Sequence, residues 1–403
     1  MASASGDAAA DGEEHRRALI IGAGPAGLAA AIALARIGID VRLFERQSEL
    51  RRTGAGLGVQ SNALRALQKL GVGDRIAAGG TELRAQEICD IHGRRMFSFP
   101  QGEVADEYGT PTISLLRWDV QRALRDAVPD GVLRMSSECV AVEQDDDGAS
   151  ARFADGSVER GALLIGADGG RSAVRRHVYG DEDIPPRYSG FTSWRSVADI
   201  GPGILPPATA RTFLGAGKQF VMFPVGGETI YWGLMKGEPE GGSDSPEDLH
   251  RLLIRHLHQF PEVTRRLVEA TDPAEIARAD VYDRDPERTW HRGRILVIGD
   301  AAHMTTPFAG QGAGISMEDA VVLAKELALT RGLRDQRMLG PALDSFERAR
   351  MKRCANIVLT SRRRGRIFSW SNPAVVAVRN AALRAVPARV WRNEVAKSIE
   401  YDI

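Results

Sequence analysis

The chain has 403 residues, of which 43% are hydrophobic and 26% are charged, a composition typical of a globular protein with two or three domains. Lysines and arginines together number 53, as do aspartates and glutamates, so the net charge is zero. That balance argues against a nucleic-acid partner, which would leave a basic surface. The three cysteines stand in no metal or redox spacing, so we expect buried structural thiols in a reducing compartment and no metal site.

Two segments bear on where the protein works. Residues 1–15 are small, polar and acidic, which predicts a disordered tail rather than a signal peptide. The apolar segment 374–391 is interrupted by three arginines and a proline and therefore cannot span a bilayer. We expect a cytoplasmic monomer or homodimer without a membrane span. The arginine-rich run 362–366 favours a solvated helix face over contact with phosphate or a membrane.

The first elements in chain order form a βαβ unit. An apolar strand over 17–21 is followed by a glycine turn, a helix over 26–37 and a second strand over 41–44, a succession that implies a parallel sheet. Residues 134–165 differ, because short alternating runs are separated by Asp-Gly turns, and they predict an antiparallel meander.

A second sheet is expected in the middle of the chain. Its strands are predicted at 191–197, 212–214, 220–223 and 230–234, with Gly and Pro between them. A helix beginning at Pro246 follows, then a buried strand over 295–298, and the remainder is mostly helical.

The glycine turn after the first strand carries a G-x-G-x-x-G fingerprint. Gly22 permits the tight turn, Gly24 lets the backbone approach a pyrophosphate, and Gly27 lets the helix pack on the strand. Glu45 at the end of the second strand can accept hydrogen bonds from ribose hydroxyls. The pattern indicates a dinucleotide site, and it fits FAD and NAD alike.

Two later segments favour FAD. Each places a carboxylate directly after a buried strand: Asp168 follows 163–167, and Asp300 follows 295–299. A second glycine-rich helix start over 307–314 offers backbone N–H groups to another electron-rich group, such as the pyrimidine edge of a flavin. Finding both after a dinucleotide fingerprint makes ordinary strand-end turns an unsatisfactory explanation.

With these motifs the chain resembles the single-component, class A flavoprotein monooxygenases, the para-hydroxybenzoate hydroxylase superfamily, over about residues 17–400. The resemblance implies an α/β fold: a Rossmann-like FAD-binding domain, a substrate domain built on a mixed β-sheet, and C-terminal helices. The corresponding boundaries are a tail over 1–15, an FAD-binding domain of 16–84 with 110–186 and 276–368, a substrate domain of 85–109 with 187–275, and a helical segment over 369–403.

The resemblance also implies residue roles. Asp168 would serve the flavin ribityl region and a transient pyridine nucleotide, Asp300 would hold the ribityl chain, and the loop 54–56 with Asn62 would pass close to the flavin ring. The expected FAD-binding residues are Gly22, Gly24, Ala26, Gly27, Glu45, Arg46, Gly56, Arg117, Gln121, Asp168, Asp300, Pro307, Gly310, Gly312, Ala313 and Gly314.

Candidate catalytic residues are Pro307 beside the flavin and, on the substrate sheet, Arg195 and Tyr231. His303 fits a structural cap better than a general base. The glycine-rich loop 54–58 supplies neither the cation nor the histidine that relatives acting on small acidic aromatics place near the ring, which favours a larger, mostly apolar substrate.

The chemistry that the resemblance implies is hydride transfer from NADPH or NADH to FAD, then capture of O₂ as a C4a-hydroperoxide. One oxygen atom would then pass to an aromatic or polyene small molecule. NAD(P)H is expected on the surface near Asp168, Arg171 and Arg175, since the chain has one dinucleotide fingerprint. The alternatives are an FAD-dependent reductase of an unsaturated or isoprenoid substrate and a flavin-binding protein without turnover. The W-x-W-x-I-P signature of flavin halogenases is absent.

Overall fold

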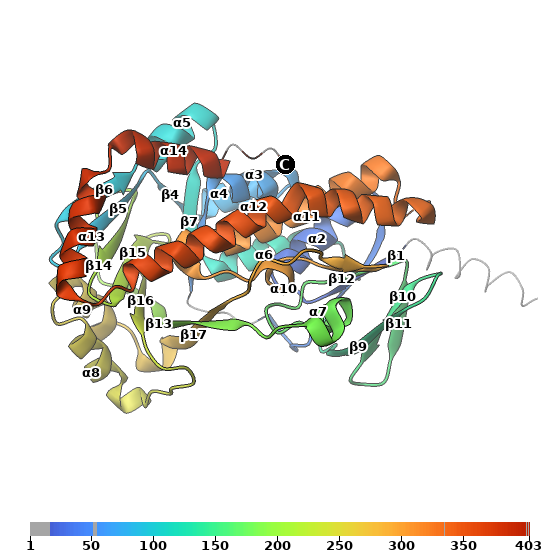
Figure 1. Cartoon of the computed structure of the whole chain (residues 1–403), viewed down its shortest axis with the longest axis horizontal. Helices are drawn as coiled ribbons and strands as arrows, with labels where there is room; N and C mark the ends of the chain where they lie inside the picture. Colours follow the sequence, from blue (N-terminus) through green and yellow to red (C-terminus); the bar gives the residue numbers. More distant parts are fainter. Residues whose placement is uncertain (1–16, 51–54, 334, 400, 402) are drawn as a thin grey trace, which may run out of the picture.

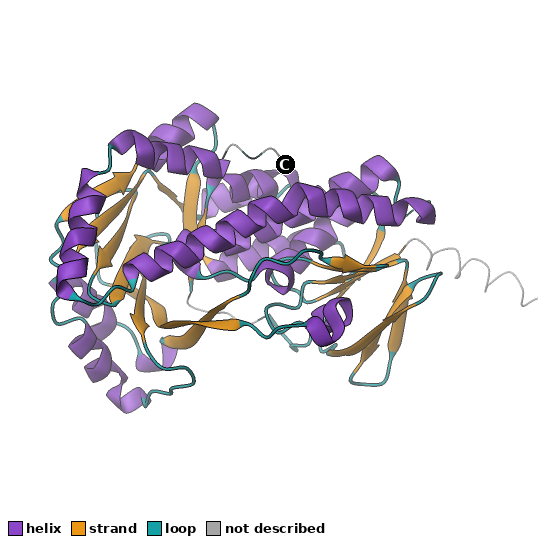
Figure 2. Cartoon of the chain, in the orientation of Figure 1, coloured by secondary structure: helices purple, strands orange, loops and turns teal. Residues whose placement is uncertain are grey.

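The computed structural model describes residues 17–50, 55–333, 335–399, 401 and 403 (Figure 1). The predicted tail over 1–15 and Gly54 lie outside these residues. The described chain forms a six-stranded sheet, a seven-stranded sheet and two three-stranded sheets, with long helices running between and beside them (Figure 2). The fold is α/β with C-terminal helices, as the sequence predicts.

The six-stranded sheet contains the predicted βαβ unit. Its central strand β1 pairs in parallel with β12 on one side and β2 on the other, and only the edge strand β18 is antiparallel to its neighbour. The strands, in order across the sheet, are β18 (His291–Arg292), β19 (Ile295–Val297), β12 (Leu163–Gly166), β1 (Arg17–Ile21), β2 (Asp40–Phe44) and β8 (Leu133–Arg134).

Helix α2 (Pro25–Arg36) is apolar on nearly every side and is buried from Ala26 to Leu34. A helix of this kind must be covered all round, and α11 (Gly312–Thr330) packs along it opposite the sheet. The two helices carry the first and the last glycine-rich motifs, so their packing brings those motifs together.

The antiparallel meander consists of β9 (Cys139–Gln144), β10 (Ala149–Phe153) and β11 (Val158–Gly161). The prediction extended this meander to residue 165, which is wrong. Residues 163–166 form β12, which pairs in parallel with β1 and β19. The run is fully buried, and a strand buried on both faces belongs in a parallel sheet.

The seven-stranded sheet contains the four strands predicted between residues 191 and 234. One of its faces packs against α8 (Pro246–His256) and α9 (Glu262–Glu269) around the buried rings of Trp194 and Trp232. The strands, in order, are β17 (Ala277–Asp283), β13 (Arg187–Asp199), β16 (Thr229–Gly237), β15 (Lys218–Pro224), β14 (Thr209–Leu214), β5 (Ala85–Asp90) and β6 (Arg95–Phe99).

A small sheet of β3 (Gly56–Val59), β7 (Thr112–Leu116) and β4 (Thr81–Leu83) lies next to the seven-stranded sheet, and Ser114 on β7 donates to the carbonyl oxygen of Pro224 on β15 at 2.6 Å. We propose that the chain divides into FAD-binding and substrate domains with the predicted boundaries. One strand crosses such a boundary: β17, which follows the predicted end of the substrate domain at residue 275, pairs with β13 in the seven-stranded sheet.

The other helices are α3 (Ser61–Lys69), α4 (Gly73–Gly79), α5 (Gln101–Tyr108), α6 (Arg117–Ala127), α7 (Ala173–Tyr179), α10 (Asp300–His303), α12 (Leu339–Phe368), α13 (Pro373–Ala385) and α14 (Ala388–Ile399), with 3₁₀ turns at Gly180–Glu182, Pro273–Glu275, Pro307–Ala309 and Gln336–Met338. Within the described ranges, no helix is both long enough and apolar enough to cross a membrane.

Candidate flavin and substrate site

The glycine turn between β1 and α2 is shaped by three different requirements. Gly22 has a φ of +101°, and a Cβ there would lie 2.6 Å from the carbonyl oxygen of Ala167. A Cβ on Gly27 would lie 1.8 Å from the carbonyl oxygen of Gly22. A Cβ on Gly24 would meet no protein atom within 4 Å. Gly22 and Gly27 are therefore needed by the fold itself, whereas Gly24 fits the close approach of a pyrophosphate to the helix N-terminus.

Side chains from β2 and α6 hold this turn. Glu45 accepts hydrogen bonds from the backbone N–H of Ala23 at 2.9 Å and of Gln47 at 3.0 Å. Gln121 donates to the carbonyl oxygen of Ala23 at 3.3 Å. Arg46 is exposed beside Glu45. The structure thus brings Glu45, Arg46 and Gln121 together at the glycine turn, and the ribose contact of Glu45 stays a prediction.

Asp168 caps the N-terminus of α7. One carboxylate oxygen accepts from the N–H groups of Ala173 at 2.7 Å and Val174 at 3.3 Å. The other oxygen, Oδ1, is buried and has no hydrogen-bond partner among the described residues. Burial raises the pKa of Asp168, against the N–H groups and Ser172, which lower it. An unpaired buried carboxylate oxygen fits a hydroxyl donor such as those of a flavin ribityl chain.

Asp300 begins the short helix α10 and is exposed, with no hydrogen bond from its carboxylate within the described part of the chain. Gly299 before it has a φ of +60°, and a Cβ there would lie 2.7 Å from the Cβ of Ala26 on α2. The first and third motifs therefore touch, and Asp300 presents a free carboxylate beside the N-terminus of α2, as a ribityl-binding role requires.

The glycine-rich segment before α11 is joined to α3. Gln60 donates to the carbonyl oxygens of Ala309 and Gly310, both at 3.2 Å. Asn62 donates to the side-chain oxygen of Gln311 at 3.0 Å. Gly310 has a φ of +63°, which turns the chain into the helix. Five predicted residues lie on this segment: exposed Pro307 opens its 3₁₀ turn, Gly310 ends it, and Gly312, Ala313 and Gly314 form the first turn of α11.

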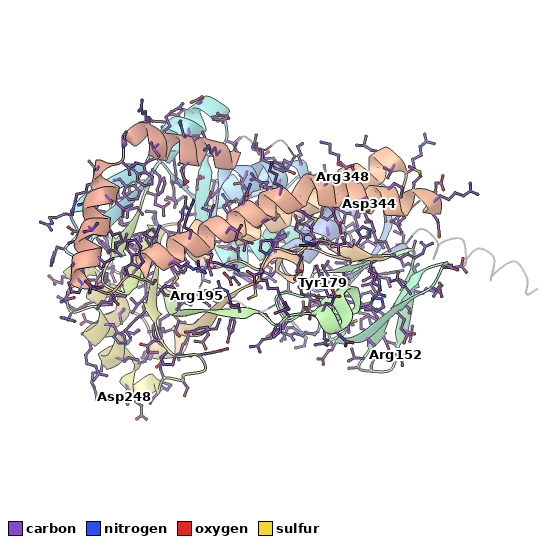
Figure 3. The ribbon with its side chains drawn as sticks, viewed as in Figure 1. Arg152, Tyr179, Arg195, Asp248, Asp344 and Arg348 are labelled. Atoms are coloured by element: carbon purple, nitrogen blue, oxygen red, sulfur yellow. The ribbon has the colours of Figure 1, made fainter. Side chains whose placement is uncertain are left out.

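The face of the seven-stranded sheet away from α8 and α9 meets the flavin loop at Gly56. A Cβ on Gly56 would lie 2.6 Å from the Cβ of Tyr231 and 2.9 Å from the ring of Phe223. The hydroxyl of Tyr231 lies over Gly233, which is paired with Arg195 on β13. Tyr231 and Arg195 therefore project from the same face of neighbouring strands. Of the two, Arg195 is labelled in Figure 3.

Charge links this face to the flavin motifs. The Arg117 side chain is exposed to solvent, yet desolvation by the surrounding protein lowers its pKa. The positive charge of Arg195 lowers this pKa further, and the negative charge of Asp300 raises it. Burial raises the pKa of the Tyr231 hydroxyl, and Arg195 counteracts it. Residues of the substrate sheet and of the cofactor motifs thus sense each other electrostatically, as parts of one site do.

A family model described as "FAD binding domain" matches residues 16–361. The chain belongs to this family. It is 38% identical over 380 residues to the aurachin C monooxygenase/isomerase of Stigmatella aurantiaca, covering 93% of this chain and 97% of that relative. It is 33% identical over 351 residues to the FAD-dependent urate hydroxylase of Klebsiella pneumoniae subsp. pneumoniae, covering 86% and 89%.

The crystal structure of Klebsiella pneumoniae HpxO complexed with FAD and uric acid matches with a TM-score of 0.89 at 30% identity, over 96% of this chain and 97% of that one. The predicted resemblance to class A flavin monooxygenases is confirmed, and the protein is an FAD-dependent monooxygenase.

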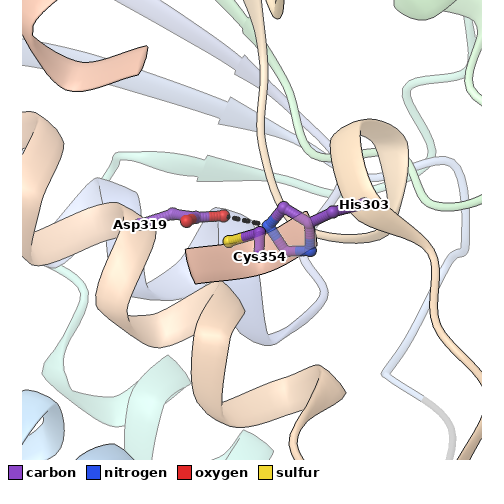
Figure 4. A group of neighbouring side chains, drawn as sticks. All are labelled: His303, Asp319 and Cys354. Carbon is purple, nitrogen blue, oxygen red and sulfur yellow. Dashed lines mark hydrogen bonds and ion pairs between the residues drawn. The ribbon is translucent and has the colours of Figure 1, made fainter. Parts of the chain in front are cut away.

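In this flavin monooxygenase, His303 is buried, and its Nε2 contacts Asp319 at 2.6 Å (Figure 4). Burial lowers the pKa of His303, but Cys354 and Asp319 raise it by more. The net result is a pKa well above the ordinary value for histidine. Asp319 also accepts from the N–H of Gly299 at 3.0 Å. The geometry agrees with the structural reading of His303, because the residue braces the loop that presents Asp300.

The same cluster contains residues that the sequence interpretation missed. Arg350 is fully buried on α12 and donates to Asp319 at 2.8 Å and to Glu318 at 2.6 Å. His303, Asp319 and Cys354 lie close enough to resemble a metal site. Arg350 already supplies the positive charge that Asp319 needs, so the geometry favours an ion-pair network over a metal centre.

One predicted contact is wrong. Arg175 was expected beside a surface-bound nicotinamide, but its side chain is fully buried, stacked on Tyr179 and paired with Asp183 and Glu287. Arg175 is the third residue of α7, and its ion pairs with two acids outside that helix hold its side chain in the interior. Arg171 is exposed at the end of the motif, so the predicted surface role stays open for Asp168 and Arg171 alone.

Proposed function

We propose that this enzyme uses NADPH or NADH and O₂ to insert one oxygen atom into an aromatic small molecule that combines an ionisable group with a larger apolar body. The observation that carries the proposal is the placement of Arg195 and Tyr231 on the sheet face that meets the flavin loop at Gly56. Epoxidation of a polyene and reduction of an unsaturated substrate are the alternatives.

The polar part of the site suits a hydroxyl or anionic group on the ring. Neither the Arg195 guanidinium nor the Tyr231 hydroxyl makes a hydrogen bond to another described residue, so both can bind substrate. Arg117 adds a second positive charge nearby. Two cations in a partly desolvated site lower the free energy of an adjacent phenolate or enolate, which makes the ring more electron-rich for oxygen transfer.

The rest of the face is apolar. Val221 and Phe223 on β15 lie beside Gly233 and Gly56, and Phe191, Met235 and Phe308 form a cluster further along. A planar ring with an apolar substituent can bury both against this surface and exclude water from the reacting atoms. The aurachin C monooxygenase/isomerase and the urate hydroxylase are both relatives, and the apolar lining supports the larger substrate.

FAD, when bound, supplies the hydride and oxygen chemistry, and the protein supplies binding and orientation. The N–H groups at the start of α2 would hold the pyrophosphate, Asp300 and Asp168 would accept from ribityl hydroxyls, and the N–H groups of the first turn of α11 would bind the pyrimidine edge. Pro307 shapes the loop between Asp300 and α11 on the flavin side. Nicotinamide reaches the flavin from the surface near Asp168 and Arg171.

We further propose a cytoplasmic monomer or homodimer. The three cysteines are free, and a reducing compartment that holds NAD(P)H suits both the thiols and the electron donor.

The test combines rapid kinetics with product analysis. The purified holoenzyme is mixed with NADPH and a panel of hydroxylated aromatics with and without apolar substituents, and NADPH oxidation, O₂ uptake and product mass are followed. We expect NADPH oxidation to rise at least tenfold with the right substrate, and a product heavier by one oxygen atom. Reduced products without O₂ uptake would establish the reductase alternative instead.

Variants localise the effect. Arg195→Gln should raise KM about tenfold to a hundredfold, the range for loss of one charge-assisted hydrogen bond, and Tyr231→Phe should lower kcat. Arg95→Gln, on the exposed edge strand β6 of the same sheet, serves as the matched control. If Arg195→Gln and Arg95→Gln have the same KM, Arg195 does not bind the substrate.

A further inference from the structure

Helix α13 buries an arginine and exposes small apolar side chains, which is the reverse of the usual pattern of a surface helix. A helix on the surface of a globular protein buries an apolar stripe and exposes polar residues. In α13 the most buried residue is Arg379, 2% exposed, which donates to the carbonyl oxygens of Phe368 and Gly215, both at 3.3 Å. Most of the outward positions are alanines and valines, with Val378 69% exposed and Val375 40% exposed. Arg384 is exposed as well and is paired with Asp90.

The apolar surface continues onto the end of α12. Leu359, Arg363, Arg366 and Trp370 follow one another at helical spacing, and all four are exposed. Val390, at the start of α14, is also 42% exposed. The C-terminal half of α12 leads into α13, which stands at one end of the molecule with α14 turning back from it (Figure 1).

The charge of this surface has a single sign. The 35 residues from 359 to 393, which include the end of α12 and all of α13, contain eight arginines and no lysine, aspartate or glutamate, in a chain whose net charge is zero. Several of these cations are neutralised by acids elsewhere, as Arg362 is by Asp283. Arg363, Arg366 and Arg389 are exposed and have no ion pair within the described part of the chain. In the run 362–366, Arg363 and Arg366 are therefore solvent-exposed as expected, whereas Arg362 and Arg364 form ion pairs.

We propose that the surface formed by Arg363, Arg366, Trp370, Val375, Val378, Arg389 and Val390, the α13 face, docks on an anionic lipid bilayer. Exposed aliphatic side chains and a tryptophan can enter the headgroup region while flanking arginines contact lipid phosphates and carboxylates. A second copy of the chain fits less well, because a symmetric contact would oppose the same arginines without an acid between them. The proposal concerns a surface away from the flavin and does not depend on the substrate.

The test is co-sedimentation of the FAD-loaded enzyme with vesicles. Wild-type enzyme should bind vesicles of equal parts phosphatidylcholine and phosphatidylglycerol and leave pure phosphatidylcholine vesicles unbound. Val378→Asp and Arg366→Glu should each weaken binding at least tenfold. The matched controls are Val158→Asp, at an exposed valine 59% accessible on β11, and Arg348→Glu, at the other end of α12 (labelled in Figure 3). Both should bind as wild type does, and FAD content reports that every variant is folded.

Each other outcome overturns the proposal. Absence of binding to the anionic vesicles, or equal loss in the controls, removes the α13 face as a lipid site. Loss with Arg366→Glu but not with Val378→Asp reduces it to non-specific charge attraction. A concentration-dependent dimer in sedimentation velocity that Val378→Asp dissociates would show that a second copy covers this face.

Discussion

Replacing Arg350 with methionine tests whether the buried ion-pair network supports the flavin loop. Arg350 is fully buried and donates to Glu318, Asp319 and the carbonyl oxygen of Ile315. Removing one partner of a buried ion pair costs about 3–5 kcal/mol. Without Arg350, Glu318 keeps Arg353 and Asp319 keeps His303 as cationic partners, so part of the buried negative charge is left uncompensated. With an unfolding entropy of about 2.1 cal/mol/K per residue, a chain of 403 residues would lose about 4–6 °C in Tm.

The pH dependence separates this effect from simple loss of packing. Burial raises the pKa values of Glu318 and Asp319, but their cationic partners lower them more, so both stay ionised in the wild-type enzyme. Without Arg350 the carboxyls should protonate at higher pH, and their uncompensated charge disappears as the pH falls. The Tm difference between variant and wild type should therefore be largest near about pH 8 and shrink towards about pH 5.

Differential scanning calorimetry at several pH values, with and without added FAD, measures both effects. The matched control is Arg348→Met on the same helix, where the arginine is exposed. FAD affinity should also fall in Arg350→Met, because Asp319 holds the N–H of Gly299. The reasoning is refuted if Arg350→Met lowers Tm no more than Arg348→Met does, or if its penalty is the same at all pH values.

Three further predictions concern the cofactor motifs. Asp300→Ala should weaken FAD binding about tenfold to a hundredfold, measured by fluorescence titration of the flavin-free protein, since each charge-assisted hydrogen bond contributes about 1.5–3 kcal/mol; unchanged affinity would remove Asp300 from the ribityl site. Gly24→Ala should leave the Tm of the flavin-free protein unchanged and lower FAD affinity, whereas Gly27→Ala should destabilise the protein itself, because its Cβ would meet Gly22; equal losses of Tm would contradict this distinction. Burial raises the pKa of Asp168, so at pH values above the ordinary carboxyl range the ionised side chain destabilises the folded protein. This destabilisation fades as the pH falls and the carboxyl protonates. Asp168→Asn should therefore raise the Tm of the flavin-free protein at neutral pH, with a smaller gain in acid, while slowing anaerobic reduction by NADPH; wild-type reduction rates would leave Asp168 a structural cap.

The cofactor motifs could be predicted because their geometry is local and the sheet is parallel. Ile21 pairs with Gly166, and Gly166 pairs with Val297, so the three strand ends lie side by side at one edge of the sheet. Residues that follow parallel strands meet at that edge whatever the rest of the chain does. Gly22, Asp168 and Asp300 follow these three strands, and the structure places them at this edge of the sheet.

The errors come from long-range partners. Arg175 looked like a surface residue because nothing within its own helix predicts that Asp183 and Glu287 enclose it. Glu318 and Asp319 did carry a signal, since two adjacent acids stand in the apolar first half of the helix. Such a pair requires a buried cation, but its identity as Arg350, on another helix, follows only from the packing of α11 against α12.

Substrate recognition is less readable from sequence for a similar reason. Successive side chains of a strand point to opposite faces of the sheet. Because the neighbouring residues Trp194 and Trp232 are buried in the core, Arg195 and Tyr231 must point to the other face. It cannot show that the opposite face meets the flavin loop rather than solvent. That outcome is fixed by Gly56, where a side chain would overlap Tyr231. A loop glycine thus lets the substrate sheet come within contact of the cofactor site. For this reason the chemistry of a class can be read from its motifs, whereas its substrate depends on how one sheet face packs against one loop.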